Sequence, residues 1–164
     1  MRRRQVPRPR GGRRCHRPLA LCYETLVDRR RRLFWHGIFL FFLGLVVGAF
    51  VQRMTNPRMG LSAHLGGVMT GTFLAVLGAL WSELRLSSRA ESAAYRLAFF
   101  GAYGSSASLL LAAILGTSSA TPIAGAGHSA PGWQEAMVTL GLQSTAAAML
   151  LCCLLLLWGL AGRR

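Results

Sequence analysis

His64 is a titratable side chain inside an apolar stretch that is long enough to form a membrane helix. Residues three and four positions apart share one face of a helix. Apart from the imidazole, the face that carries His64 has only small side chains, whereas the other faces carry leucine, methionine, phenylalanine and valine. Its members are Gly60, His64, Gly67, Gly71, Ala75, Gly78 and Ser82. We call this feature the small-residue face, and it predicts a neighbour that approaches closely.

Two interpretations of the small-residue face remain open from spacing alone. In the first, Gly67 and Gly71 form a G-x-x-x-G motif against which a second helix packs, and His64 makes a hydrogen bond across that contact. In the second, the small residues leave space for a flat cofactor such as haem, and the His64 imidazole is its axial iron ligand. Polar side chains within membrane spans are costly and are candidates for function, although the cost is lower for His64, close to the end of its span.

A second group of polar side chains lies in the third apolar stretch of the chain. Tyr103 is the only phenol well inside an expected span. It is a candidate to donate a hydrogen bond to a reacting oxygen or to satisfy a neighbouring carbonyl. Ser105 and Ser106 follow it, so this segment is either tightly packed or the wall of a polar pocket. The spans contain no pair of carboxylates and no Ser-His-Asp arrangement, so any chemistry is left to a cofactor. His36, near the start of the first expected span, is interpreted as an interfacial residue.

Four apolar stretches must hold these side chains, and each is close to the roughly 20 residues that cross a bilayer. The expected spans cover about residues 33–51, 61–81, 97–115 and 136–160. We therefore expect an all-α fold, an integral membrane four-helix bundle over residues 29–164. Residues 1–28 form an arginine-rich N-terminal arm that we expect to be disordered, with a short interfacial helix over residues 19–27 as an alternative for part of it.

The formal net charge of +14 is unevenly distributed. All 19 basic residues are arginine, and 12 of them precede Leu33. No aromatic or glycine pattern of a recognition module accompanies them, so we expect no nucleic acid among the partners. An arginine-rich flank is typical of a cytoplasmic segment beside anionic lipid headgroups. Placing the arm, the connection over residues 82–96 and the C-terminal tail inside predicts a multi-pass protein of the inner (plasma) membrane with both termini in the cytoplasm.

The stretch NPRMGLSAHLGGVMTGTFLAVLGALW, from Asn56 to Trp81, resembles the second helix of the hydroxylaminobenzene mutase family, which is similar to the membrane styrene-oxide isomerases. The segments GTSSATPIAGAGH and WQEAMV also resemble the mutase pattern, and the resemblance covers roughly residues 29–164. It implies a small four-helix membrane protein that assembles as a trimer and holds haem b between subunits through a histidine that matches His64. The resemblance further implies that haem iron acts as a Lewis acid, on an epoxide in the isomerases and on an aryl hydroxylamine in the mutases.

For this chain, the resemblance implies a membrane isomerase, an intramolecular mutase that acts on a small aromatic hydroxylamine or epoxide. His64 is then the metal ligand, and Gly67 and Gly71 lie beside the haem. Tyr103, Thr70 and Ser105 are the predicted catalytic side chains of the pocket. The isomerases have asparagine where this chain has Thr70, and the mutases tend to have Tyr-Ala-Asn-Trp where this chain has Tyr-Gly-Ser-Ser from Tyr103. These smaller side chains predict a wider pocket.

A second hypothesis belongs to another functional class. The chain is then a non-catalytic membrane packing or accessory protein that uses its G-x-x-x-G faces for assembly, with His64 as a hydrogen-bonding residue. The expected partners under the first hypothesis are membrane lipid, a small aromatic substrate and further copies of the same chain. The second hypothesis predicts assembly without a cofactor.

Overall fold

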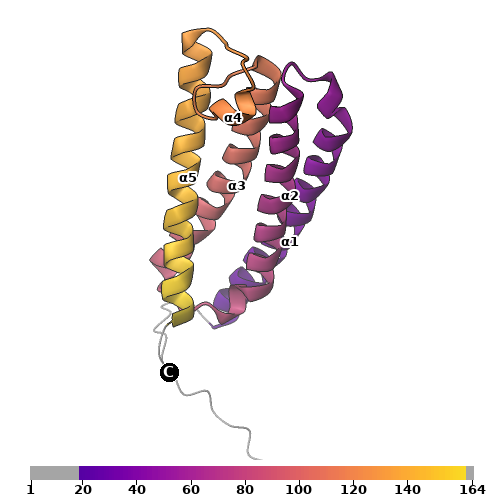
Figure 1. The fold of residues 1–164 in the computed structure, drawn as a ribbon. Coiled ribbons are helices and arrows are strands. Elements are labelled where there is room, and N and C mark those ends of the chain that lie inside the picture. Colours follow the sequence, from indigo (N-terminus) through magenta and orange to yellow (C-terminus); the bar gives the residue numbers. More distant parts are fainter. Residues whose placement is uncertain (1–18, 162–164) are drawn as a thin grey trace, which may run out of the picture.

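The computed structural model describes residues 19–161, with side chains from residue 27 onwards. Four long helices lie side by side, and a short helix lies at one end of them (Figure 1). The helices are α1 (Leu19–Phe50), α2 (Pro57–Leu80), α3 (Ser88–Leu115), α4 (Pro122–Gly125) and α5 (Gly132–Ala161), with 3-10 turns η1 (Val51–Arg53) and η2 (Trp81–Glu83). This part of the chain contains no strand, which confirms the all-α fold. The disorder expected for residues 1–18 concerns a segment outside the described residues.

Each of the four long helices is long and apolar enough to cross a membrane, as expected. All four begin before the expected spans, and the difference is largest for α1 and α3. α1 begins at Leu19, so residues 19–28, which we assigned to a disordered arm, are helical. Because arginine is a good helix former, the helix begins before its apolar segment, within the arginine-rich residues. α3 begins at Ser88, inside the expected connection, because the Ser87 hydroxyl accepts a hydrogen bond from Ala90 N and caps the helix.

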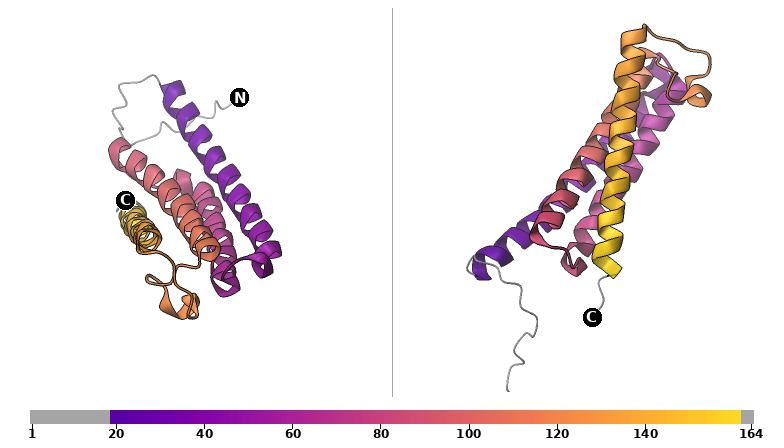
Figure 2. Two further views of the ribbon diagram at one scale, coloured as in Figure 1. Left: turned by 90° about the horizontal axis from the view of Figure 1, so that it is seen from above. Right: turned by 90° about the vertical axis from the view of Figure 1, so that its left-hand side faces the viewer.

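The long helices follow one another in space in the order α1, α2, α3, α5 (Figure 2). α1 packs on α2, α2 packs on α3, and α3 packs on α5. Large apolar side chains on the outer faces are exposed, as Phe42, Met69 and Leu150 illustrate. Helices that are apolar on nearly all faces without being buried in protein are typical of membrane spans. The order of the helices places α2 and α3, which carry the predicted site residues, in the middle.

The contact between α1 and α2 depends on glycines in both helices. A Cβ atom on Gly44 would lie 2.7 Å from the backbone nitrogen of Val68, and one on Gly67 would lie 2.9 Å from the Cα atom of Gly44. A Cβ atom on Gly37 would lie 2.5 Å from the backbone nitrogen of Ala75. Because the obstructing atoms belong to helix backbone, a side chain at these positions would force the helices apart. The small-residue face therefore packs against α1, which confirms the packing interpretation of its glycines.

Asn56 connects the start of α2 with the end of α3 and with α4. Its buried side chain accepts a hydrogen bond from Met59 N at 3.1 Å, which caps α2. Its Nδ2 atom donates to the carbonyl oxygens of Ala124 and Gly125, both at 3.0 Å. Its backbone nitrogen donates to the carbonyl oxygen of Ala113 at 3.1 Å. Asn56 thus caps α2 and holds the loop that contains α4.

We expect Asn56→Ala to lower the free energy of unfolding by about 2–4 kcal/mol. Loss of a helix cap costs about 0.5–2 kcal/mol, and buried carbonyls left without a donor add about 1–3 kcal/mol. Denaturation of the purified protein in detergent measures the change. Ser87→Ala is the matched control, because it removes one exposed cap bond and is expected to cost about 1 kcal/mol. Equal losses in the two variants would contradict the role assigned to the Asn56 amide.

Candidate functional site

The His64 imidazole is half-buried on α2 and is oriented by α1. Its Nδ1 atom lies 2.8 Å from the carbonyl oxygen of Gly44. A carbonyl oxygen only accepts hydrogen bonds, so Nδ1 carries the proton and donates it. In the neutral ring, Nε2 then has a free lone pair. A histidine that ligates a metal commonly donates its other ring N–H to a backbone carbonyl in this way.

The Nε2 atom of His64 is accessible from outside the chain. It has no hydrogen bond to any described residue, and no buried side-chain nitrogen or oxygen of the described residues lacks a partner. It follows that Nε2 is accessible. Gly48 of α1 makes room for the ring, because a Cβ atom there would lie 2.6 Å from Nδ1 of His64. Gly44 and Gly48 together hold the imidazole, because the Gly44 carbonyl accepts its hydrogen bond and Gly48 leaves space for the ring.

Gly67 and Gly71, which we predicted beside a cofactor, are both buried against α1. A Cβ atom on Gly71 would collide with the backbone nitrogen of Phe41 and would lie 2.8 Å from the carbonyl oxygen of Gly37. The space that these glycines leave is therefore filled by the backbone of α1. Within one chain, helix packing accounts for both positions, whereas Nε2 of His64 has no hydrogen bond to any described residue.

Tyr103 of α3 forms a polar pair with His36 of α1. The phenolic oxygen lies 2.8 Å from His36 Nδ1. Phe99 and Trp35 each place a ring against the imidazole, with centroids 4.9 Å away and the planes nearly perpendicular. Sequence reasoning assigned His36 to the interface and missed this contact. The only signal available was a second polar side chain in an otherwise apolar span.

Thr70 of α2 forms a second polar pair with α3, through Ser106. The two hydroxyl oxygens are 3.1 Å apart. Thr70 also donates to the carbonyl oxygen of Gly66 at 2.6 Å, and Ser106 donates to that of Ala102 at 2.8 Å. Each hydroxyl has one hydrogen, so the contact between the two side chains forms only when one of them turns from its own helix. Each of these hydroxyls can therefore bond either to a carbonyl of its own helix or to the hydroxyl on the other helix.

The structure brings some of the predicted residues together and separates others. Tyr103 and Ser106 are three positions apart and share a face of α3, which places Thr70 and Tyr103 at the same side of that helix. Ser105 lies elsewhere on α3, and its hydroxyl donates to the carbonyl of Ala102 in its own helix at 3.2 Å. His64 precedes Thr70 by six residues, which corresponds to about 9 Å along α2 and about a third of a turn around it. In one chain, His64 thus faces α1 while Thr70 faces α3.

We expect Thr70→Val to lower the free energy of unfolding by less than about 1 kcal/mol, because interhelical hydrogen bonds in membranes average about 0.6 kcal/mol. Thr72→Val is the matched control, since the exposed Thr72 hydroxyl donates only to Val68 O of its own helix. Detergent denaturation and turnover are measured for both variants. If Thr70 contacts substrate, only Thr70→Val changes turnover. A stability loss of several kcal/mol would instead assign Thr70 to the fold.

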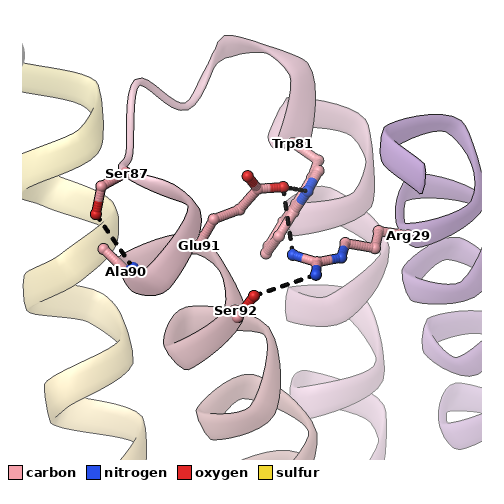
Figure 3. Close-up of polar contacts among 6 residues, drawn as sticks. All are labelled: Arg29, Trp81, Ser87, Ala90, Glu91 and Ser92. Atoms are coloured by element: carbon pink, nitrogen blue, oxygen red, sulfur yellow. Dashed lines mark hydrogen bonds and ion pairs between the residues drawn. The ribbon is translucent and has the colours of Figure 1, made fainter. Parts of the chain in front are cut away.

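A separate polar cluster connects α1, η2 and α3 near one end of the helices (Figure 3). The Glu91 carboxylate accepts a hydrogen bond from Trp81 Nε1 at 3.1 Å and lies 3.5 Å from an Arg29 guanidinium nitrogen. Arg29 also donates to Ser92 Oγ at 3.1 Å. Both charges are largely shielded from solvent and neutralise each other. None of the predicted site residues belongs to this cluster, whose contacts hold three elements together.

Comparisons with known proteins identify the family of this chain. The family model for styrene oxide isomerase matches residues 29–161. Hydroxylaminobenzene mutase HabB of Ectopseudomonas oleovorans is 44% identical over 131 residues, which are 79% of this chain and 80% of that protein. Hydroxylaminobenzene mutase HabA of the same organism is 37% identical over 129 residues, which are 78% of this chain and 96% of that protein. No solved structure matches the chain. The chain therefore belongs to the styrene oxide isomerase family and is a multi-pass membrane isomerase.

Proposed function

We propose that this isomerase is an intramolecular mutase that converts a small aromatic hydroxylamine into an aminophenol. Both curated relatives are named for such a mutase, and each matches more than three quarters of this chain. The observation that carries the proposal is the state of His64, whose Nδ1 donates to Gly44 while Nε2 stays accessible with a lone pair.

The proposed cofactor is haem b, which His64 would hold through its Nε2 atom. The chemistry of the residue fits this group, because the hydrogen bond to Gly44 fixes both the tautomer and the plane of the ring. When bound, ferric haem supplies a Lewis acid that polarises an N–O or C–O bond without net oxidation or reduction. The accessible Nε2 would suit a haem held between copies of the chain, and we propose a homo-oligomer, a trimer by resemblance.

The other predicted residues hold and orient the substrate. Tyr103 donates a hydrogen bond to the oxygen that leaves nitrogen, and Thr70, with its choice of partners, binds the polar end of the substrate. Phe99, which is stacked against Tyr103, and Phe73, which is partly buried in the same apolar cluster, exclude water. The N–O bond breaks, the oxygen joins a ring carbon, the ring loses a proton and nitrogen gains one. Ser105 has the weakest support, because its hydroxyl is engaged within α3.

One chain does not bring His64 and the Tyr103 side of α3 together, and this supports a site completed by a second copy. In that assembly, the accessible Nε2 of one copy faces the polar side chains of another. The membrane supplies the remaining partner, lipid. We also propose that the protein lies in the inner membrane with both termini in the cytoplasm.

A second substrate class, a small aryl epoxide, is favoured by the description of the matching family. The same polarised C–O bond would open, and a hydride would shift to give the aldehyde. Assays with both substrates decide between the two classes. We place the mutase reaction first because both relatives, at 44% and 37% sequence identity, are named hydroxylaminobenzene mutases.

Isotope labelling tests the mutase proposal directly. Membranes that contain the protein are given hydroxylaminobenzene with ¹⁸O on nitrogen, in unlabelled water. An intramolecular transfer predicts aminophenol that retains the label, whereas attack by water gives unlabelled product. Membranes without the protein and membranes with His64→Ala serve as controls. Absence of aminophenol, or product that has lost the label, would overturn the proposal.

A further inference from the structure

The contact between His36 and Tyr103 joins two helices through side chains 67 positions apart in the sequence. Tyr103 is a predicted catalytic residue, and His36 is its one hydrogen-bond partner among the described residues. The distance of 2.8 Å between His36 Nδ1 and the phenolic oxygen is typical of a well-formed hydrogen bond. Any role of the Tyr103 proton therefore depends on this imidazole.

The surroundings of the pair restrict how it can move. Trp35 and Phe99 place their rings nearly perpendicular to the imidazole, at interplanar angles of 83° and 82°. Phe99 is also stacked against Tyr103, with ring planes 8° apart. The neighbour of His36 in the sequence, Gly37, lies against the backbone of α2, so the helix that carries the imidazole is held in place. The orientation of the imidazole is thus determined by packing on several sides.

Proton counting separates two states of this hydrogen bond. A tyrosine hydroxyl has one hydrogen to donate. If it donates to Nδ1, none remains for a substrate oxygen. If Nδ1 carries the proton and donates to the phenolic oxygen, the hydroxyl hydrogen is free to point elsewhere. An accepted hydrogen bond also makes the phenol a better donor, because hydrogen bonds in a chain polarise one another.

We propose that His36 is the positioning residue of Tyr103: its Nδ1–H donates to the phenolic oxygen and directs the Tyr103 proton to the oxygen of the substrate. This inference rests on the proposed function of Tyr103. It assigns His36, an apparent interfacial residue, to the reacting site without placing it in contact with substrate.

A double-mutant cycle tests the inference on the full chain in detergent. Tyr103→Phe is expected to lower kcat by about 10²-fold or more, because positioned proton donors contribute about 10²–10⁴-fold. His36→Leu is expected to lower kcat by about tenfold to 10²-fold through loss of orientation, with little change in KM. In the Tyr103→Phe background, His36→Leu is expected to have almost no further effect, because the group that it orients is gone.

Conservative replacement separates orientation from packing. His36→Asn places an amide near the position of Nδ1 and is expected to recover much of the activity that His36→Leu loses. His128→Leu is the matched control, since His128 Nδ1 lies 3.0 Å from Gly125 O within the α4 loop, and its kcat is expected to stay unchanged. The thermal stability of every variant is recorded, so that a folding defect is recognised independently of turnover.

The outcomes distinguish this inference from the proposed function. Loss of turnover in Tyr103→Phe with full turnover in His36→Leu would overturn the inference and leave the proposed function standing. If the fold-losses in kcat of the two single variants multiply in the double variant, the inference is also overturned, because that result is expected for residues that do not act through each other. Full turnover in Tyr103→Phe would overturn the assignment of Tyr103 and the inference with it. A non-additive cycle together with recovery in His36→Asn supports the inference.

Discussion

His64→Ala is expected to lower turnover by about 10³-fold or more while the helices stay folded. A bound Lewis acid supplies several kcal/mol of transition-state stabilisation, and about 1.4 kcal/mol corresponds to a tenfold change in rate. The imidazole makes one hydrogen bond to the protein, so its removal is expected to cost less than about 1 kcal/mol of stability. Product formation and detergent denaturation measure the two effects separately.

A graded variant accompanies this prediction. Gly48→Ala would place a Cβ atom 2.6 Å from Nδ1 of His64, so the imidazole must shift while remaining available as a ligand. We expect a smaller loss of turnover than in His64→Ala. His128→Ala removes a histidine from the α4 loop and is expected to leave turnover unchanged. Equal losses in His64→Ala and His128→Ala would show that neither effect reports ligation.

Gly71→Val is expected to destabilise the contact between α1 and α2 strongly. The Cβ atom would collide with the backbone nitrogen of Phe41 and approach the carbonyl oxygen of Gly37. Overpacking of a well-packed interior costs about 1–3 kcal/mol and occasionally more. A rigid helix backbone cannot turn aside as a side chain does, so we expect a loss of about 3 kcal/mol or more.

The matched control for Gly71→Val is a substitution at Gly132. A Cβ atom on Gly132, the first residue of α5, would meet no atom within 4 Å, and Gly132→Ala is expected to leave stability unchanged or slightly higher. Denaturation in detergent compares the two variants. If Gly71→Val is as stable as the parent protein, the close approach of α1 to α2 at Gly71 is contradicted.

The fold could be predicted from sequence because apolar length and helical periodicity are local properties. The four spans and the small-residue face follow directly from where apolar and small residues recur. Helix ends were harder to predict. Leu19 begins α1 within an arginine-rich segment, and Ser87 caps α3 within a polar connection. At such ends, capping and propensity decide the conformation, and hydropathy carries no signal.

The site was less predictable, because periodicity groups residues on one helix without naming the helix opposite. Gly67 and Gly71 share a face with His64, yet α1 fills the space beside the glycines and only orients the imidazole. Ser106, and not Ser105, meets Thr70, since the rotation of α3 about its axis is set by packing on two neighbours. His36 was missed for the same reason: its partner lies on another helix.

The visible absorption spectrum of the purified protein tests the central claim, ligation of haem by His64, most directly. The protein is purified in mild detergent from cells supplied with haem precursor, beside His64→Ala and His128→Ala. We predict a Soret band in the parent protein and in His128→Ala, and its loss or displacement in His64→Ala. An active parent protein without a Soret band, or an identical band in His64→Ala, would contradict the account.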